Sequence, residues 1–150
     1  DVIASDHAPL MTVEDIERAR KDPFAGLSGL RGIQTMLPLM IDEGIHRRGL
    51  TWPQLAGLMA GAPARRFGLY PKKGAILPGA DADLVIVNPD REWVLKEEDL
   101  LSRHRISPYL GMRLRGAVDE TILRGESVYR DGRIVAEPGS GRVVLRGARN

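Results

Sequence analysis

The hydrophobic pattern of the chain changes between Gly68 and Lys73, and this change limits the folds that the sequence can adopt. Before it, apolar residues recur at helical spacing; after it come short runs rich in β-branched residues, separated by turn residues. Asp131-Gly132, between two such runs, predicts a two-residue hairpin turn because both residue types tolerate a positive φ. We therefore expect a helical part followed by a β-rich part. The predicted strands there are residues 75–77, 84–87, 92–95, 117–123, 127–130, 133–135 and 143–145.

Helices are expected mainly before this change. Thr12 and the acidic residues after it predict a capped helix over 13–20. A core-facing helix follows, which Pro38 could bend. A capping box at Thr51 to Gln54 starts another helix, which should end near residues 61–63. One more turn of helix is expected over 64–67, and a short helix over 96–102 should carry two leucines inward. The apolar residues of the core-facing helix are Ile33, Met36, Leu37, Met40 and Ile41.

Composition indicates an ordinary globular chain. Its 150 residues are 43% hydrophobic and 28% charged, which is enough for one domain with a core. The net charge of +2 is too small to indicate nucleic-acid or membrane binding. The absence of cysteine excludes a disulfide framework and suits the reducing cytoplasm. Because the sequence opens at Asp1 on a strand-like run without an initiator methionine, we expect it to be a piece of a longer protein.

The first residues of the chain predict the position of a catalytic site. Residues 2–4 are apolar and read as a buried strand that ends at Ser5 or Asp6, and Pro9 disfavours helical geometry immediately afterwards. A strand end of this kind carries the catalytic residues of a β/α barrel. On the residues alone, Asp6 could equally be a helix cap or a turn former, which is the commoner role of such an aspartate.

Four motifs in one order resemble those of the cyclic amidohydrolases, the group that contains dihydroorotase, allantoinase and hydantoinase (dihydropyrimidinase). The resemblance implies an α/β plus β fold: the end of a TIM-like (β/α)8 metal-dependent hydrolase barrel, followed by part of a small β-sandwich. Residues 1–68 would hold the last barrel strand and the C-terminal helices, and residues 69–150 the β-sandwich segment. The motifs are Ser-Asp-His-Ala-Pro at 5–9, Gly-Ala-Ile-Leu-Pro-Gly-Ala-Asp-Ala-Asp-Leu-Val at 74–85, Ser-Pro-Tyr-Leu-Gly at 107–111, and Gly-Ala-Val at 116–118 with Thr-Ile-Leu-Arg-Gly at 121–125.

The same resemblance implies a role for Asp6 in a binuclear zinc centre. The carboxylate at this motif would bind the more buried metal and take a proton from the bridging hydroxide as it attacks an amide carbonyl. A metal lowers the pKa of its water to about 7, and a fixed carboxylate can carry the proton to the leaving nitrogen. The family's other ligands, a His-x-His pair, a carboxylated lysine and two further histidines, are absent from this sequence. We therefore expect the 150-residue chain alone to be inactive.

The three histidines of the chain do not form a metal site by their spacing. Adjacent residues of an extended segment point to opposite faces, so if Asp6 faces the site, His7 faces away. We interpret His7 as a hydrogen-bonding structural residue, and we expect His46 and His104 to be solvated among arginines.

A glycine-rich loop over 24–29 is the second candidate for the site. On spacing alone, its glycines could simply form a turn. In the resembling enzymes the corresponding loop contacts the cyclic amide through its backbone, which implies substrate binding by Ala25, Gly26 and Ser28.

The resemblance implies that the substrate is a small-molecule cyclic amide or ureide. Dihydroorotases typically carry a histidine where this chain has Leu10, and an apolar side chain cannot pair with a substrate carboxylate. Residues 106–111 and 121–129 look most like allantoinase, with hydantoinase and dihydroorotase activities as alternatives. The resemblance also implies a homo-oligomer, a dimer or tetramer, for the full-length protein.

A non-catalytic scaffold or oligomerisation module is the competing hypothesis, because some relatives keep the fold and lose the ligands. We expect the β-rich part to complete the fold and mediate oligomer contacts, with Asp81 and Asp83 as turn formers. A piece of this kind would expose unpaired strand edges and should tend to associate.

Overall fold

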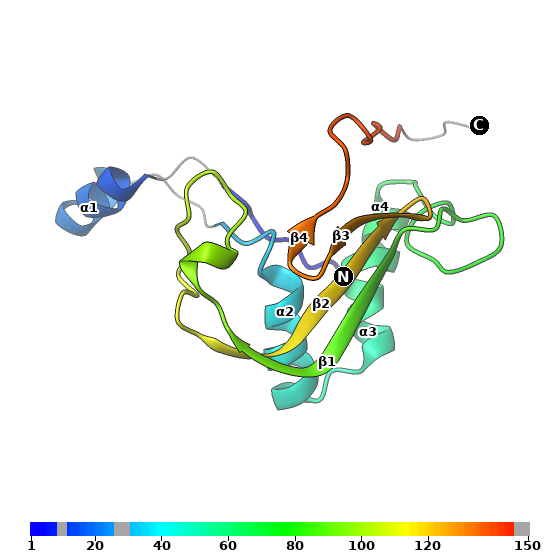
Figure 1. Cartoon of the computed structure of the whole chain (residues 1–150), viewed down its shortest axis with the longest axis horizontal. Helices are drawn as coiled ribbons and strands as arrows, with labels where there is room; N and C mark the ends of the chain where they lie inside the picture. Colours follow the sequence, from blue (N-terminus) through cyan, green and yellow to red (C-terminus); the bar gives the residue numbers. More distant parts are fainter. Residues whose placement is uncertain (9–11, 26–30, 146–150) are drawn as a thin grey trace.

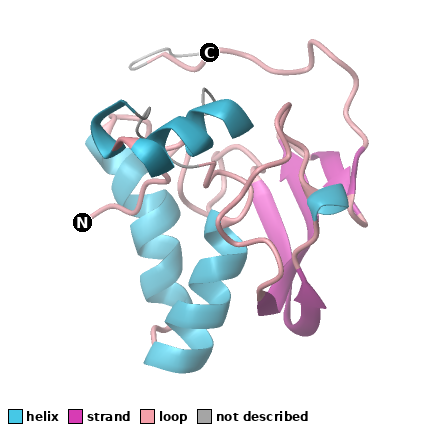
Figure 2. Cartoon of the chain, turned by 90° about the vertical axis from the view of Figure 1, so that its left-hand side faces the viewer, coloured by secondary structure: helices cyan, strands magenta, loops and turns pink. Residues whose placement is uncertain are grey.

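A computed structural model describes residues 1–8, 12–25 and 31–145 (Figure 1). It confirms a helical part followed by a β-rich part, with the long helices lying beside the sheet (Figures 1 and 2). The helices are α1 (Val13–Lys21), η1 (Pro23–Ala25), α2 (Met36–Leu39), η2 (Met40–Arg47), α3 (Trp52–Ala56), η3 (Gly57–Gly61), α4 (Ala62–Arg66) and η4 (Glu97–Asp99). The strands are β1 (Leu84–Val94), β2 (Arg113–Leu123), β3 (Glu126–Arg130) and β4 (Arg133–Ile134).

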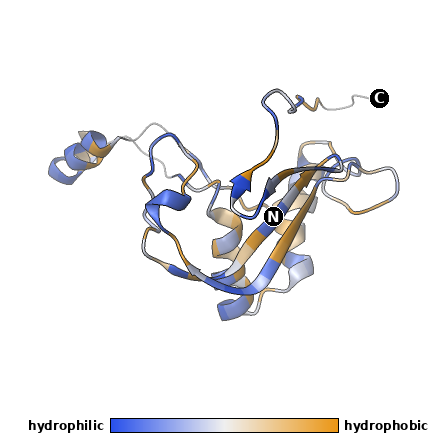
Figure 3. Cartoon of the chain, in the orientation of Figure 1, coloured by the Kyte–Doolittle hydropathy of each residue, from blue (hydrophilic) through white to orange (hydrophobic). Residues whose placement is uncertain are grey.

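Helix α1 forms as its sequence predicts. The Thr12 hydroxyl accepts a hydrogen bond from the Asp15 N–H at 3.2 Å, and the Asp15 carboxylate accepts one from the Thr12 N–H at 2.9 Å. This reciprocal pair satisfies two of the backbone donors that a helix start leaves free. The helix buries none of its residues, is largely hydrophilic and, apart from its contact with η1, lies away from the other helices and the sheet (Figures 1 and 3). Local hydrogen bonds therefore define α1, and packing adds little to it.

Two continuous helices make up the rest of the helical part. One runs through α2 and η2, and the other through α3, η3 and α4; they lie side by side (Figure 2). Pro38 lies in the first turn of the first helix, where its missing N–H costs no hydrogen bond, and the helix continues past it as η2. The capping box at Thr51 and Gln54 is confirmed. The expected end near 61–63 is wrong: the wider π-type turn of η3 precedes Pro63, and the helix continues through it.

The strands form one antiparallel sheet in the order β1-β2-β3-β4. Leu84 pairs with Ile122 at one end of the β1–β2 ladder and Val94 with Arg113 at the other. The predicted runs 84–87 and 92–95 are one strand, interrupted by a shift in register between Asn88 and Glu92. The two-residue hairpin turn is confirmed, with φ of 50° at Asp131 and 80° at Gly132.

Three predicted elements of the β-rich part are wrong. Residues 75–77 and 143–145 form no strand, and Ile76 is 85% exposed. Strands need a neighbour to pair their backbone groups, and neither segment meets one in the described chain. The helix over 96–102 shrinks to η4: Leu100 is buried at 4% exposure as expected, whereas Leu101 is 51% exposed.

The core lies where η2 meets β2. Ile41 is fully buried there, and Gly116 opposite it has a φ of +107°. A Cβ on Gly116 would lie 2.2 Å from Ile41 Cγ2, so only glycine fits. Side chains satisfy the strand's backbone at this point: Asp42 Oδ1 accepts from the Arg115 N–H at 3.0 Å, and Trp93 Nε1 donates to the Gly116 carbonyl at 3.0 Å. We call these five residues the helix–sheet junction.

The N-terminal run is not the buried strand that its sequence predicts. Val2 is 43% exposed, and residues 1–8 form no β-strand. The Ile3 N–H donates to the Leu58 carbonyl at 3.2 Å, which tethers the run to η3. Among residues 1–8, only His7 takes part in a β-bridge, and no strand of the described chain pairs with the run.

Candidate functional site

Asp6 follows this extended run, and its side chain is exposed. Its φ of 45° lies in the left-handed region, which aspartate tolerates better than most residues. Within the described part of the chain, its carboxylate takes part in no hydrogen bond or ion pair. It is thus a carboxylate with open coordination, able to accept a proton or to supply one oxygen ligand to a cation.

His7 lies half-buried next to Asp6 and makes a hydrogen bond to the start of the second helical segment. Its Nδ1 accepts from the Ile33 N–H at 3.4 Å. A ring nitrogen that accepts carries no proton, so the neutral ring has its proton on Nε2. This contact agrees with the interpretation of His7 as a hydrogen-bonding residue.

Gly32 packs directly against the residue on the other side of Asp6. A Cβ on Gly32 would lie 3.1 Å from the Ser5 carbonyl oxygen and 3.4 Å from Ser5 Cβ. The Gly32 carbonyl in turn accepts from the Met36 N–H at 2.9 Å, at the start of α2. Residues 5–7 and 32–33 are therefore in contact on both sides of Asp6.

The predicted substrate loop is described only in part. Ala25 is exposed at the end of η1, and its N–H donates to the Asp22 carbonyl at 3.0 Å. Phe24 beside it is 99% exposed. Gly26, Ser28 and Leu10 lie outside the described residues. Substrate binding by this loop thus stays a prediction.

The described residues contain no group of three or more histidine and acidic side chains that could hold a metal ion. Asp6 alone fits such a centre as a single oxygen ligand. The expectation that His46 is solvated is wrong: it is half-buried, and its Nε2 lies 2.8 Å from the Pro89 carbonyl oxygen. The end of η2 packs on the interruption in β1, which brings this ring and carbonyl together.

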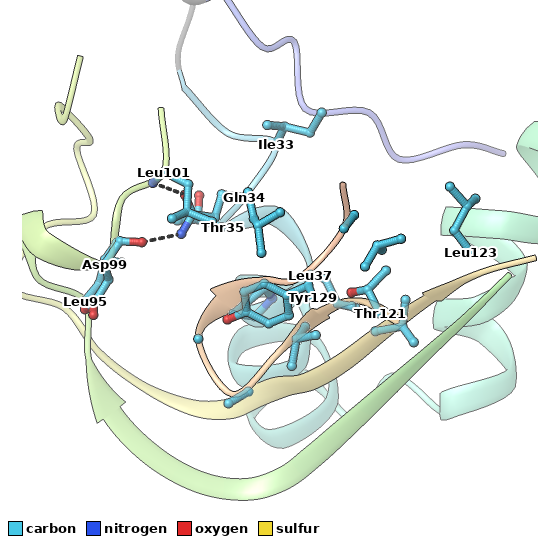
Figure 4. Close-up of a pocket in the computed structure, with 18 of the residues that line it drawn as sticks. Ile33, Gln34, Thr35, Leu37, Leu95, Asp99, Leu101, Thr121, Leu123 and Tyr129 are labelled. Atoms are coloured by element: carbon cyan, nitrogen blue, oxygen red, sulfur yellow. Dashed lines mark hydrogen bonds between the residues drawn. The ribbon is translucent and has the colours of Figure 1, made fainter. Parts of the chain in front are cut away.

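A cavity of about 700 Å³ lies between the sheet and the segment that begins α2 (Figure 4). Its lining is mainly apolar and includes Leu37, Trp93 and Tyr129. At its rim the Gln34 side chain donates to the Asp99 carbonyl at 2.7 Å and accepts from the Leu101 N–H at 2.9 Å. Sequence reasoning missed Gln34, since nothing local indicates a bond that spans 65 residues.

Lys73 joins Asp81 and Asp83, the two aspartates predicted to be turn formers. Its Nζ lies 2.9 Å from Asp81 Oδ2 and also pairs with Asp83, whose other oxygen accepts from the Arg124 N–H at 2.8 Å. Partial burial works against the Lys73 charge, but hydrogen bonds to both carboxylates outweigh it and raise the Lys73 pKa. The hydrogen bond from Lys73 lowers the Asp81 pKa. These aspartates anchor a loop and are not arranged as ligands.

None of the helices in the described ranges combines the length and apolar character needed to cross a bilayer.

Comparison with known proteins identifies the class. No family model matches the chain. Its sequence is 48% identical over 142 residues to an allantoinase of Rubrobacter xylanophilus, covering 95% of this chain and 30% of that protein. An allantoinase of Salmonella newport is 38% identical over 146 residues, covering 97% and 31%. The chain thus spans about a third of the length of the relatives that it matches.

Solved structures give the same result. An L-hydantoinase (dihydropyrimidinase) from Arthrobacter aurescens matches with a TM-score of 0.90 and 36% identity, covering 97% of this chain and 32% of that one. A dihydropyrimidinase from Brevibacillus agri matches with a TM-score of 0.89 and 28% identity, covering 99% and 33%.

These matches identify the chain as a portion of a cyclic amidohydrolase. Within that class the chain corresponds to a C-terminal portion, and its most similar sequences above are allantoinases. The resemblance stated from the four motifs is confirmed. The part of the fold seen here is the four-stranded sheet with its helices, and no barrel is formed by the described residues.

Proposed function

We propose that the whole protein to which this chain contributes hydrolyses a ring C–N bond of a cyclic ureide, as an allantoinase does. The observation that carries the proposal is the 48% identity to an allantoinase along 95% of the chain. The hydantoinase neighbours support the wider reaction class, the opening of a five- or six-membered cyclic amide.

Asp6 is the residue of this chain that we assign to the chemistry. Its exposed carboxylate, without a partner in the described residues, suits a ligand and proton acceptor that acts with groups outside these 150 residues. Two zinc ions, when bound, would polarise the amide carbonyl and lower the pKa of the attacking water. Asp6 then holds the proton released by that water and passes it to the leaving ring nitrogen.

The architecture of the whole protein follows from the same proposal. Residues 1–68 would close a (β/α)8 barrel, and residues 69–150 would form part of a β-sandwich whose other strands come from elsewhere in the polypeptide. In support, no strand of the described residues pairs with the run at residues 1–8, so strands from elsewhere in the polypeptide could take that place. The cysteine-free sequence supports a cytoplasmic location, and we expect a dimer or tetramer.

Substrate contacts are assigned to the loop that contains Ala25, Gly26 and Ser28. Its backbone groups would hold the ring amide, and Leu10 would leave no cation for a substrate carboxylate. This favours allantoin over dihydroorotate.

The full-length protein with its metals should be assayed against allantoin, hydantoin, dihydrouracil and dihydroorotate. We expect allantoin to give the highest kcat/KM. Asp6→Asn should lower kcat by about 10²- to 10⁴-fold, the usual contribution of a positioned acid–base group. Glu17→Gln, an exposed change on α1, is the matched control and should leave kcat unchanged.

Two outcomes would contradict the proposal. If no ring is opened and the full-length protein binds no divalent metal, the non-catalytic scaffold is correct. If Asp6→Asn keeps full activity, the assignment of Asp6 is wrong. The 150-residue chain alone, supplied with zinc, should show no turnover, because the remaining ligands lie outside it.

A further inference from the structure

Asp6 is held in an uncommon backbone conformation by contacts that its own side chain does not make. A φ of 45° is uncommon for a residue other than glycine, even though aspartate tolerates it, so the contacts of its neighbours help to keep it. In the part of the chain that the structure describes, residues 32–33 contact both neighbours of Asp6: Gly32 packs on Ser5, and the Ile33 N–H donates to His7 Nδ1.

Residues 32–33 are themselves anchored to buried parts of the molecule. Thr35 is 1% exposed, and its hydroxyl donates to the Gly32 carbonyl at 3.4 Å. Gln34 is fixed by its two hydrogen bonds to the backbone at Asp99 and Leu101 (Figure 4). Residues 32–33 are therefore fixed relative to the rest of the fold, and their contacts hold the backbone on both sides of Asp6 in place.

We propose that His7 is a positioning residue for Asp6. By accepting the Ile33 N–H, its Nδ1 fixes the turn that points the Asp6 carboxylate at the reaction centre. The inference rests on the proposed role of Asp6. This positioning role uses Nδ1 of His7, whereas a role as metal ligand or substrate contact would use Nε2, so the two kinds of role can be distinguished.

The two nitrogens can be told apart by substitution in the full-length protein. Asparagine places an acceptor oxygen near the position of Nδ1, and glutamine places one near Nε2. His7→Ala should lower kcat by about 10- to 100-fold with little change in KM, as the loss of groups that orient a metal ligand does, and should weaken zinc retention against a chelator. His7→Asn should recover most of both, and His7→Gln should behave like His7→Ala.

Hydrogen exchange of the Ile33 amide supplies a readout that does not depend on activity. We expect this amide to be protected in the wild type and in His7→Asn, and unprotected in His7→Ala. Gly32→Ala disturbs the same turn from the other side, by pressing on the Ser5 carbonyl, and should lower kcat while His7 is intact. Melting curves identify any variant that fails to fold, and Gly32→Ala and His7→Asn serve as alternatives to His7→Ala in that case.

Rescue by glutamine but not by asparagine would overturn the inference and assign the role to Nε2. Unchanged Ile33 exchange in His7→Ala would also overturn it, whatever the activity. If the wild-type protein opens no cyclic amide, the proposed function fails, and the exchange experiment still decides whether His7 holds the turn.

Discussion

The helix–sheet junction and the segment that carries Asp6 differ in almost every physical respect. At the junction, Ile41 is buried at 0% exposure, and side chains complete the hydrogen bonds of the strand backbone. Around Asp6, Val2 is 43% exposed, and a single backbone bond ties the run to η3. Since burial of apolar surface is the main source of folding free energy, stability comes from the junction.

The difference teaches that, if Asp6 acts as proposed, the chain's stability and its chemistry depend on different regions. Among the described residues the exposed Asp6 side chain contributes no hydrogen bond or ion pair to the fold, so its substitution can affect one without the other. The four predictions below test this separation by comparing the free energy of unfolding of variants of the 150-residue chain.

Gly116→Ala should have the largest effect. The new Cβ would overlap Ile41, and the φ of +107° adds backbone strain, so we expect a loss of about 2–5 kcal/mol. Gly111→Ala is the matched control: its φ is +81°, but nothing lies within 4 Å of the new atom. It should cost only about 1–2 kcal/mol of strain. Equal losses in urea unfolding would show that the contact with Ile41 does not matter.

Asp42→Ala should come next, at about 1–3 kcal/mol, because it leaves the Arg115 N–H without its acceptor. Asp42→Asn should cost less, since an amide oxygen can still accept that hydrogen bond and only the pair with Arg47 is lost. Glu43→Ala removes ion pairs at the exposed side of the same helix and should change stability by less than about 1 kcal/mol. If Asp42→Ala matched Glu43→Ala, the bond to β2 would contribute nothing.

The Lys73 cluster should give a smaller, pH-dependent effect. The Asp81 pKa is lowered on folding, so its contribution is complete above the ordinary aspartate pKa of about 4 and is lost as the pH falls through the lower folded value. The Lys73 pKa is raised, so its contribution is complete below about pH 10 and is lost as the pH rises through the folded value. Lys73→Met should flatten both limbs of a plot of melting temperature against pH. Limbs as steep as those of the wild type would contradict this.

Asp6→Asn should have the smallest effect on stability, within about 0.5 kcal/mol, because the side chain is exposed and has no partner among the described residues. The same substitution should abolish most activity of the full-length protein. A clear loss of stability would mean that the carboxylate has a structural role, and the separation would not hold.

The elements that could be predicted from the sequence are those with local causes. The cap at Thr12, the capping box at Thr51 and the Asp131-Gly132 turn depend on residues within three positions of one another, and all three are confirmed. The strands predicted at 75–77 and 143–145 have suitable residues but meet no partner, which no local pattern can reveal.

For the site, four motifs in one order, of which Ser-Asp-His-Ala-Pro at 5–9 is the first, predicted the class, and the relatives confirm that class. The role of Asp6 stays a prediction. The motifs could not predict the contact of His7 with Ile33 or that of Gln34 with Leu101, because these depend on which distant backbone groups the fold leaves free. His46 was misjudged for the same reason: its neighbours in sequence are arginines, but its neighbour in space is the Pro89 carbonyl.

The absence of a side chain at Gly116 also affects how β1 and β2 align. A slip of one residue between β1 and β2 would turn every side chain of a strand to the opposite face. A slip of β1 along β2 would carry the Trp93 indole away from the Gly116 carbonyl that it binds. A slip of β2 along η2 would place Arg115 or Ala117 opposite Ile41, where a side chain has no room. The glycine and the indole therefore favour the same alignment of the two strands on the helix.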